Sequence, residues 1–327
     1  MIAYLCPDTD DPSGGIRVIY RHVDLLNHDG LHATVLHGKR GFRCSWFEHE
    51  TRVSYLSEIS LDEAVIVIPE VVGRRIAMLA PGLRKVIFNQ GAYNTFEGHP
   101  LDLADRGTPY LCPEVEAAIV VSEDSAAYLR YAFPKLPIYR TINAIDPGIF
   151  YPASIRRRRI AFMPRRNLKD AAQVINILKF RGVLDNVELL PIEGLDERGV
   201  AACLTDTLIF LNFGTAEGSP TPPKEAMACG CLTIGYHGMG GREFLSPDVA
   251  YPIPTGDVLT FAKTVEAVLA QYPATENPLP PKGRAAAAVI REHYSPQRER
   301  DTVLRCWEQI LSTLRPSTRA GDEDGRP

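Results

Sequence analysis

The amino-acid sequence predicts an α/β protein of two domains, each with a parallel β-sheet at its centre. The first observation is length, because 327 residues suffice for about two domains of ordinary size. The second is that short apolar runs alternate with segments of helical periodicity, which is typical of a parallel sheet covered by helices on both faces. The third is that this alternation stops at residues 143–159 and then starts again.

In the first half of the chain, five apolar runs predict buried strands. They lie at residues 2–6, 33–37, 64–69, 85–89 and 117–122. Between the first two runs, apolar residues recur at intervals of three and four from Ile16 to Leu26. This spacing predicts an amphipathic helix over residues 15–29.

The second half repeats the pattern. Strands are predicted at residues 160–164, 187–191, 208–212 and 231–236, with helices starting from Lys169, near Arg198 and from about Pro222. We therefore expect a first domain over residues 1–150 and a second over residues 151–295, followed by a helix over residues 296–314. The composition of residues 315–327 predicts a disordered tail.

Composition excludes several classes of protein. Hydrophobic residues make up 45% of the chain and charged residues 23%, as in ordinary soluble globular proteins. The net charge of −4 argues against nucleic acid as a partner. The chain shows no signal-peptide pattern and no apolar run of membrane-spanning length, so we expect a cytoplasmic protein. Seven scattered cysteines predict neither a disulfide framework nor a zinc site, and Cys229 and Cys231 are expected to be small buried residues.

The loop after the first predicted strand contains two features that could bind a ligand. Gly14 and Gly15 precede the first helix, where paired glycines let the backbone approach a phosphate or sugar. They could equally make only the turn. Asp8 and Asp10 have a spacing that can hold a divalent metal, but a solvated loop or helix cap is the commoner role of such residues.

Residues 214–243 are the most informative segment of the chain for function. Glu217 follows a predicted strand, and Glu225 lies eight residues later, inside a helix whose start Pro222 and Pro223 favour. Both carboxylates can then face one cleft. Because a carboxylate accepts hydrogen bonds from vicinal hydroxyls, the pair suits a ligand with two diols, such as a nucleotide sugar. The alternative is a helix cap beside an ordinary surface glutamate.

The segment AEGSPTPPKEAMACGCLTIG (residues 216–235), followed by GMGGREFL (238–245), resembles the E-x7-E region of retaining glycosyltransferases of family 4. These enzymes have the GT-B fold, in which two Rossmann-like domains face each other across a cleft. Three further segments resemble the family in the same order: residues 13–38, residues 121–152 and FMPRRNLKDAAQVINIL (162–178). The resemblance covers nearly all of residues 1–245.

The resemblance implies roles for particular residues. Glu225 would bind the ribose hydroxyls, and Glu217 would bind hydroxyls of the transferred sugar and act in catalysis. Arg165 and Lys169 would neutralise the diphosphate, as their charge also suggests. Arg166 and Lys169 could instead be solvent-facing basic residues. The small residues that would line the donor site are Gly14, Gly15, Gly218, Ser219, Thr221, Gly240 and Gly241. More broadly, residues 239–243 would line the donor pocket.

The chain departs from the family pattern at several positions. Lys169 follows Arg165 by four residues, one fewer than usual, so Arg166 could take the role of the arginine. Prolines at the start of the helix before Glu225 remove backbone donors for an anion. Where many members carry a histidine, NQGAYNTF offers Gln90 and Tyr93, which are candidates for contacts with the sugar or acceptor. Neither is a good base at neutral pH, so no general base is assigned.

The resulting expectation is a hexosyltransferase-like, retaining, metal-independent enzyme with a nucleotide-sugar substrate and no cofactor. Its donor would bind the second domain and its acceptor the first. The acceptor could be a glycan, a lipid-linked saccharide or a small molecule. Peripheral membrane association rests only on the four arginines at residues 156–159, which more often form a solvated linker. The alternatives are a non-catalytic nucleotide-sugar or glycan binder, or another GT-B enzyme such as a nucleotide-sugar epimerase.

Overall fold

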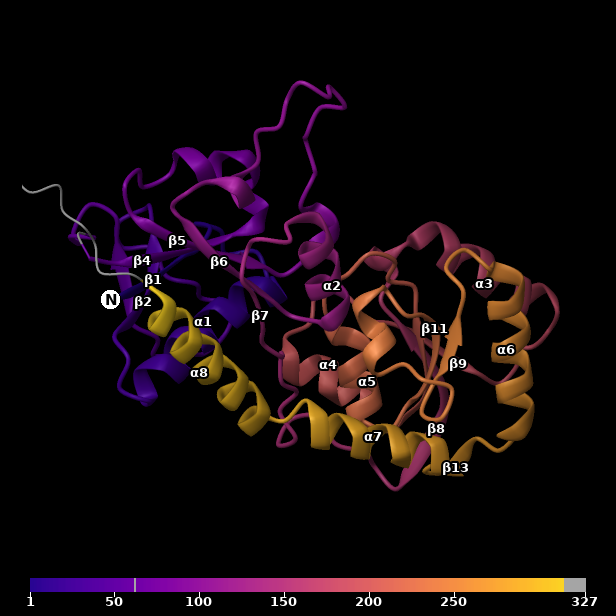
Figure 1. The fold of residues 1–327 in the computed structure, drawn as a ribbon. Helices are drawn as coiled ribbons and strands as arrows, with labels where there is room; N and C mark the ends of the chain where they lie inside the picture. Colours follow the sequence, from indigo (N-terminus) through magenta and orange to yellow (C-terminus); the bar gives the residue numbers. More distant parts are fainter. Residues whose placement is uncertain (62, 315–327) are drawn as a thin grey trace, which may run out of the picture.

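The computed structural model describes residues 1–61 and 63–314 and contains two α/β domains that lie side by side (Figure 1). The predicted α/β class and its two parallel sheets are confirmed. The predicted disordered tail over residues 315–327 lies outside the described residues. Among residues 1–61 and 63–314, no helix is long and apolar enough to cross a membrane.

The N-terminal sheet has seven parallel strands in the order β3-β2-β1-β4-β5-β6-β7. These are β1 (Ile2–Leu5), β2 (Ala33–His37), β3 (Val53–Tyr55), β4 (Val65–Pro69), β5 (Arg84–Asn89), β6 (Val115–Val120) and β7 (Ile138–Arg140). All five predicted strands are present. The two edge strands, β3 and β7, were not predicted, because three half-buried residues are too few to show a periodicity.

Helices cover both faces of this sheet. The predicted amphipathic helix is α1 (Gly14–His28), which packs with Tyr4 and other strand residues in one core. The opposite face packs against α2 (Glu123–Ala132) and the short helices η1 (Glu70–Met78) and η3 (Pro109–Leu111). A further short helix, η2 (Ala92–Asn94), follows β5. Because the helices cover only the two faces of the sheet, the strand ends remain available for the loops of the candidate site.

The C-terminal sheet repeats the architecture. Its strands are β8 (Ile155–Phe162), β9 (Glu188–Pro191), β10 (Thr207–Asn212), β11 (Leu232–Tyr236), β12 (Tyr251–Ile253) and β13 (Glu276–Pro278). The order is β12-β11-β10-β8, and the far edge of β8 pairs with β9 in parallel and with β13 antiparallel.

Two cores lie on the two faces of this second sheet. One contains residues of α4 (Glu197–Leu204), α5 (Thr221–Ala228) and α7 (Pro281–His293). The other contains residues of α3 (Leu168–Phe180) and α6 (Val258–Gln271). Short helices η4 (Pro164–Arg166) and η5 (Gly240–Glu243) follow β8 and β11 at the strand ends.

The expectation that the arginine run is a solvated linker is wrong, because all four arginines lie in β8. Arg156 is fully buried, and its guanidinium donates to the carbonyls of Leu204, Thr205 and Thr207. Arg159 is also buried and pairs with carboxylates. Carbonyl groups between the end of α4 and the start of β10 thus hold the buried Arg156 guanidinium, whereas a run of four arginines in the sequence suggests exposure to solvent. The run therefore offers no continuous basic surface to a membrane.

The last helix, α8 (Pro296–Thr313), lies against the N-terminal domain (Figure 1). Its Trp307 is fully buried, and the indole Nε1 donates to the Tyr4 hydroxyl at 2.9 Å. The chain thus passes between the domains twice, and the two passages are joined by a hydrogen bond from the Ile145 amide to the Tyr294 carbonyl at 2.8 Å.

Candidate active site

The candidate site lies where loops leave the carboxyl ends of the parallel strands in both domains. In such sheets these ends share one edge, which is where ligands bind. A pocket of about 190 Å³ is lined by Pro12, Ser13 and Gly14 of the N-terminal domain and by Arg165 and Arg166 of the C-terminal domain. The two domains therefore both contribute to this pocket.

Glu217 is held by its backbone in the loop after β10. Its amide donates to the Gly238 carbonyl at 2.9 Å, and its carbonyl accepts from the Gly240 amide at 3.0 Å. Its carboxylate lies 3.4 Å from the guanidinium of Arg166. Burial raises the pKa of Glu217, and the charges of Arg166 and Arg165 oppose this rise. A methyl group on Gly214 would overlap the Glu217 carboxylate, so the neighbouring glycine makes room for it.

Glu225 is buried in α5, close to the N-terminal domain. Burial raises its pKa to about 7; the charge of Arg17 opposes this rise, and that of Glu197 adds to it. Arg17 belongs to α1 and forms a 2.9 Å ion pair with Glu197 of α4. The carboxyl group of Glu225 therefore titrates near neutrality, beside a charged pair that joins the two domains.

The start of α5 offers few backbone donors. Pro220 is the N-cap residue, Thr221 is the first helical residue, and Pro222 and Pro223 follow. Because proline has no N–H group, Thr221 supplies the free amide of this first turn. An anion at this position must therefore be bound chiefly by side chains.

The basic residues follow β8. Arg165 and Arg166 are in η4, whereas Lys169 is an exposed residue in the first turn of α3. Both arginines line the pocket. Arg166 is the one that pairs with Glu217. The structure thus brings both arginines to the pocket, and Lys169 is outside its lining.

The first loop and the loop after β5 contact each other. The side-chain amide of Gln90 donates to the Gly15 carbonyl at 3.0 Å, and a Cβ atom on Gly15 would lie 3.2 Å from that nitrogen. Tyr93 donates to Asp124 at 2.8 Å. Gly14 has open space where a side chain would be. Gln90 therefore supports the glycine loop, and Tyr93 is bound to the start of α2.

Three predicted glycines make close contacts. A methyl group on Gly218 would overlap the carbonyl oxygen of Gln90 across the domain interface, and one on Gly240 would overlap the carbonyl oxygen of Gly218. A Cβ atom on Gly241 would lie 3.2 Å from Leu245. The first two contacts require glycine whether or not a ligand is bound.

Lys224 was not predicted, although it lies between two predicted positions. It is fully buried, and its Nζ donates to Ser219 Oγ at 2.9 Å and to the Asn143 carbonyl at 3.2 Å. Burial lowers its pKa to about 8. The ammonium also lies 4.9 Å from the centroid of the Tyr294 ring. A lysine next to a glutamate in an otherwise apolar helix was the signal that could have identified it.

Glu70 was also missed. It directly follows β4, is buried, and has its pKa raised to about 7 by burial, while the amides of Gln90 and Gly91 bind its carboxylate and lower the pKa. It therefore shapes the loop that carries Gln90. An acidic residue at the carboxyl end of an apolar strand could have been found from the sequence.

The remaining metal candidates have structural roles. Asp8 accepts from the Lys39 amide at 2.8 Å, and Asp10 accepts from the Ser45 amide at 2.6 Å, so both bind the loop after β2. Cys229 and Cys231 are both buried, as predicted. Within residues 1–61 and 63–314, no group of three or more His, Cys, Asp or Glu side chains is placed to hold a metal ion.

Comparison by sequence finds one curated relative but no matching family model. The chain is 25% identical over 199 residues to an alpha-1,6-glucosyltransferase of Actinobacillus pleuropneumoniae serotype 7. The match spans 57% of this chain and 58% of the length of the relative.

Solved structures resemble the whole chain. Sucrose-phosphate synthase from Thermosynechococcus elongatus superposes with a TM-score of 0.69 at 13% identity, over 96% of this chain and 99% of the other. The lipopolysaccharide outer core galactosyltransferase WaaB gives 0.66 at 13%, with the same coverage. HepE of Anabaena, in complex with UDP and glucose, gives 0.62 at 12%, again over 96% and 99%. The chain therefore has the GT-B fold, with two Rossmann-like domains, that these glycosyltransferases share.

Proposed function

We propose that this protein is a retaining glycosyltransferase that moves a sugar from a nucleotide-sugar donor to an acceptor. One observation carries the proposal: the Glu217 carboxylate pairs with Arg166, whose side chain lines a pocket shared with Gly14 of the opposite domain. A carboxylate beside clustered guanidinium groups suits a ligand that has both hydroxyls and phosphates. The glucosyltransferase relative and the UDP and glucose bound in HepE support the same class of ligand.

The donor would be bound mainly by the C-terminal domain. Glu225 accepts hydrogen bonds from the ribose hydroxyls, and Glu217 accepts them from the sugar. Arg165 and Arg166 neutralise the diphosphate, with Lys169 approaching from the first turn of α3. Because α5 begins with prolines, these side chains replace backbone donors that the helix lacks. Ser219, Thr221, Gly240 and Gly241 complete the surroundings of the donor.

The reaction breaks the bond between the anomeric carbon and the diphosphate oxygen, while the acceptor oxygen attacks the same face of the sugar. The acceptor proton passes to the departing diphosphate. The arginines stabilise the negative charge that develops there, which is the role a metal ion plays in other transferases. We therefore propose a reaction that needs no metal and no cofactor. Because the acceptor attacks the face from which the diphosphate leaves, the anomeric configuration is retained without a nucleophilic side chain.

The acceptor would be bound by the N-terminal domain, near Gln90 and Tyr93. Gln90 donates to Gly15, so its amide oxygen remains for an acceptor hydroxyl. A glycan, a lipid-linked saccharide and a small molecule remain the candidate acceptors. A cytoplasmic location stays a prediction.

Release of nucleotide from UDP-, GDP-, dTDP- and ADP-sugars, with and without EDTA, tests the proposal. Slow release from one donor at the same rate in EDTA is the expected result. Thermal shifts with free nucleotides, run in parallel, separate a transferase from a binder. Stabilisation by a nucleotide, with no release from any donor in the presence of pooled glycan, lipid-linked and small-molecule acceptors, would contradict turnover.

A further inference from the structure

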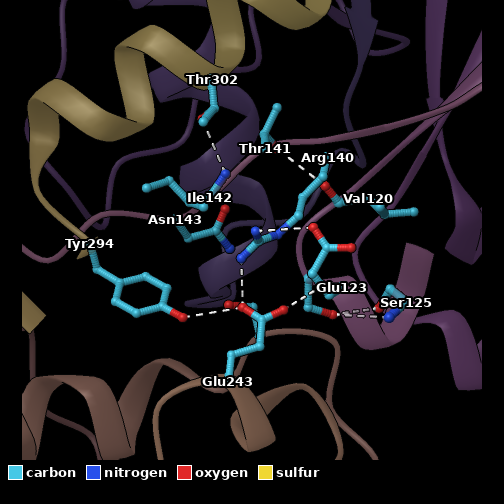
Figure 2. Close-up of polar contacts among 12 residues, drawn as sticks. Val120, Glu123, Ser125, Arg140, Thr141, Ile142, Asn143, Glu243, Tyr294 and Thr302 are labelled. Carbon is cyan, nitrogen blue, oxygen red and sulfur yellow. Dashed lines mark hydrogen bonds and ion pairs between the residues drawn. The ribbon is translucent and has the colours of Figure 1, made fainter. Parts of the chain in front are cut away.

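The Glu243 carboxylate joins the two domains. It belongs to η5 of the C-terminal domain and accepts from the Arg140 guanidinium at 2.6 Å and from the backbone amide of Glu123. Both donors belong to the N-terminal domain, at the end of β7 and at the first residue of α2. The Tyr294 hydroxyl donates to the same carboxylate at 3.2 Å, from the end of α7. Figure 2 shows these three donors converging on Glu243.

The chemistry of this contact favours a carboxylate. The amide at the start of a helix carries a partial positive charge, which adds to the full charge of the guanidinium. Hydrogen bonds between charged groups are also stronger than neutral ones. Arg140 is further held by Glu123 Oε1 at 3.2 Å, so its orientation is set from its own domain.

The turn that carries Glu243 also holds Glu217. Residues 238–240 bond the backbone of Glu217 on both sides, through the Gly238 carbonyl and the Gly240 amide. The Arg242 amide donates to the Met239 carbonyl at 3.1 Å and continues the turn into Glu243. Phe244 is buried next to it and packs edge-on against the Tyr294 ring. Backbone hydrogen bonds therefore connect Glu217 to the same short segment that carries Glu243.

We propose that Glu243 is a positioning residue for the transfer reaction. By binding Arg140 and the start of α2, it fixes the turn of Glu217 against the N-terminal domain when the domains are closed. The inference rests on the proposed function of Glu217. The contact of Gly218 with the Gln90 carbonyl shows how close the opposed surfaces are in this arrangement.

Two other ion pairs between the domains are weaker or do not involve this turn. Arg242 and Asp124 are 3.4 Å apart, and Arg242 is more than half exposed, so this pair contributes little. Arg17 and Glu197 join α1 to α4, and neither helix belongs to the turn that holds Glu217. Two ion pairs of the described residues thus link the N-terminal domain to that turn, and the pair of Arg140 and Glu243 is the shorter and less exposed of the two.

A double-mutant cycle tests the proposal, with Glu243→Gln, Arg140→Met and both changes together. The control cycle uses Arg181→Met and Glu266→Gln, which break a 2.8 Å ion pair within the C-terminal domain. Each protein is assayed for kcat, for donor KM and for nucleotide affinity. Interdomain distance is followed by fluorescence transfer between labels at Tyr131→Cys and Leu259→Cys, which are exposed positions in the two domains. Cys112 and Cys203, the two free cysteines that are not buried, are first replaced by serine.

We expect Glu243→Gln and Arg140→Met each to lower kcat about tenfold, as for loss of a partly buried ion pair. The double variant should be no worse than either single one. Nucleotide affinity should stay within about twofold, because donor-binding side chains are untouched, and the labels should move apart. Arg140→Lys should restore part of kcat. The control cycle should change neither kcat nor label distance.

Additive effects in the cycle, or unchanged label distance in both single variants, would overturn the positioning role. The label distance does not depend on turnover. If the parent transferred no sugar from any donor while the labels still moved apart, the proposed function would fail and the interdomain contact of Glu243 would stand.

Discussion

The carbonyl oxygen of Gln90 lies directly against Gly218, so that the loop of the candidate catalytic carboxylate touches the opposite domain without an intervening side chain. Gln90 also donates to Gly15. A single residue of the N-terminal domain therefore contacts both the first glycine loop and the turn of Glu217. Backbone atoms of the site therefore help to set the relative position of the two domains.

Gly218→Ala should block this approach. The added methyl group overlaps a backbone oxygen that has no rotamer to change, so the domains must separate or the loop must shift, at a cost of roughly 1–3 kcal/mol. We expect kcat to fall at least tenfold and the unfolding midpoint to fall by the few degrees that correspond to this cost. Gly148→Ala is the control, because only the side chain of Asp146 lies nearby. Parent-like turnover in Gly218→Ala would show that this contact is not part of the active arrangement.

Donor binding should strengthen as pH rises from 6 to 8. The pKa of Glu225 is raised to about 7, and ribose hydroxyls donate to the ionised carboxylate, whose fraction increases through this range. Calorimetric titration with an intact nucleotide sugar is suitable, because its diphosphate does not titrate in this range. Glu225→Gln should bind more weakly and show no such rise, whereas Glu266→Gln should follow the parent. An affinity that falls with pH in the parent would refute the role of Glu225.

Lys224→Met should change how stability depends on pH. The folded-state pKa of Lys224 is about 8 against an ordinary 10.5, so the folded protein binds fewer protons than the unfolded chain between these values. The stability of the parent should therefore rise, relative to Lys224→Met, as pH increases from 8 to 10.5, by roughly 3 kcal/mol in full.

Urea unfolding of both proteins at pH 7, 9 and 10.5 checks this difference. Groups that titrate alike in the two proteins make equal contributions to the unfolding free energy, so they cancel in the difference between the parent and Lys224→Met. A constant gap across the three pH values would mean that Lys224 keeps its ordinary pKa in the folded state.

Much of the fold could be predicted because apolar runs report burial directly. The strands β1, β2, β4, β5 and β6 appear near their expected positions. Three-residue strands such as β3 and β13 are too short to show a repeated alternation of apolar and polar residues, so tertiary pairing alone defines them. Arg156 is buried because carbonyls of Leu204, Thr205 and Thr207 meet its guanidinium, and no local pattern reports so distant a set of acceptors.

In the site, too, some residues could be predicted from the sequence and others depend on tertiary contacts. Glu217, Arg166 and Gly14 were identified from the sequence, and the structure places all three around one pocket or in direct contact with its lining. The contact between Arg140 and Glu243 could not be predicted, because it depends on how two domains meet across 103 positions of sequence. Residues 239–243 are expected to line the donor pocket, and no sequence pattern indicates that Glu243 also contacts α2, β7 and Tyr294.

The last helix should stabilise the N-terminal domain. Trp307→Ala removes a fully buried side chain from its core, which costs about 3–5 kcal/mol. Leu311→Ala, on the same helix but 38% exposed, should cost less than about 1 kcal/mol. Denaturant unfolding of the two variants measures the contrast. Equal losses would mean that α8 is not anchored through Trp307.

Sugar transfer by the parent and by Glu217→Gln, with nucleotide affinity measured on the same samples, tests the central claim most directly. The donor is the nucleotide sugar from which the parent releases nucleotide, and the anomeric configuration of the product is read by NMR. We predict a product with the configuration of the donor, a fall in turnover of at least a hundredfold in Glu217→Gln, and nucleotide affinity within a few-fold of the parent. An inverted product, or a Glu217→Gln variant that turns over like the parent, would contradict the account.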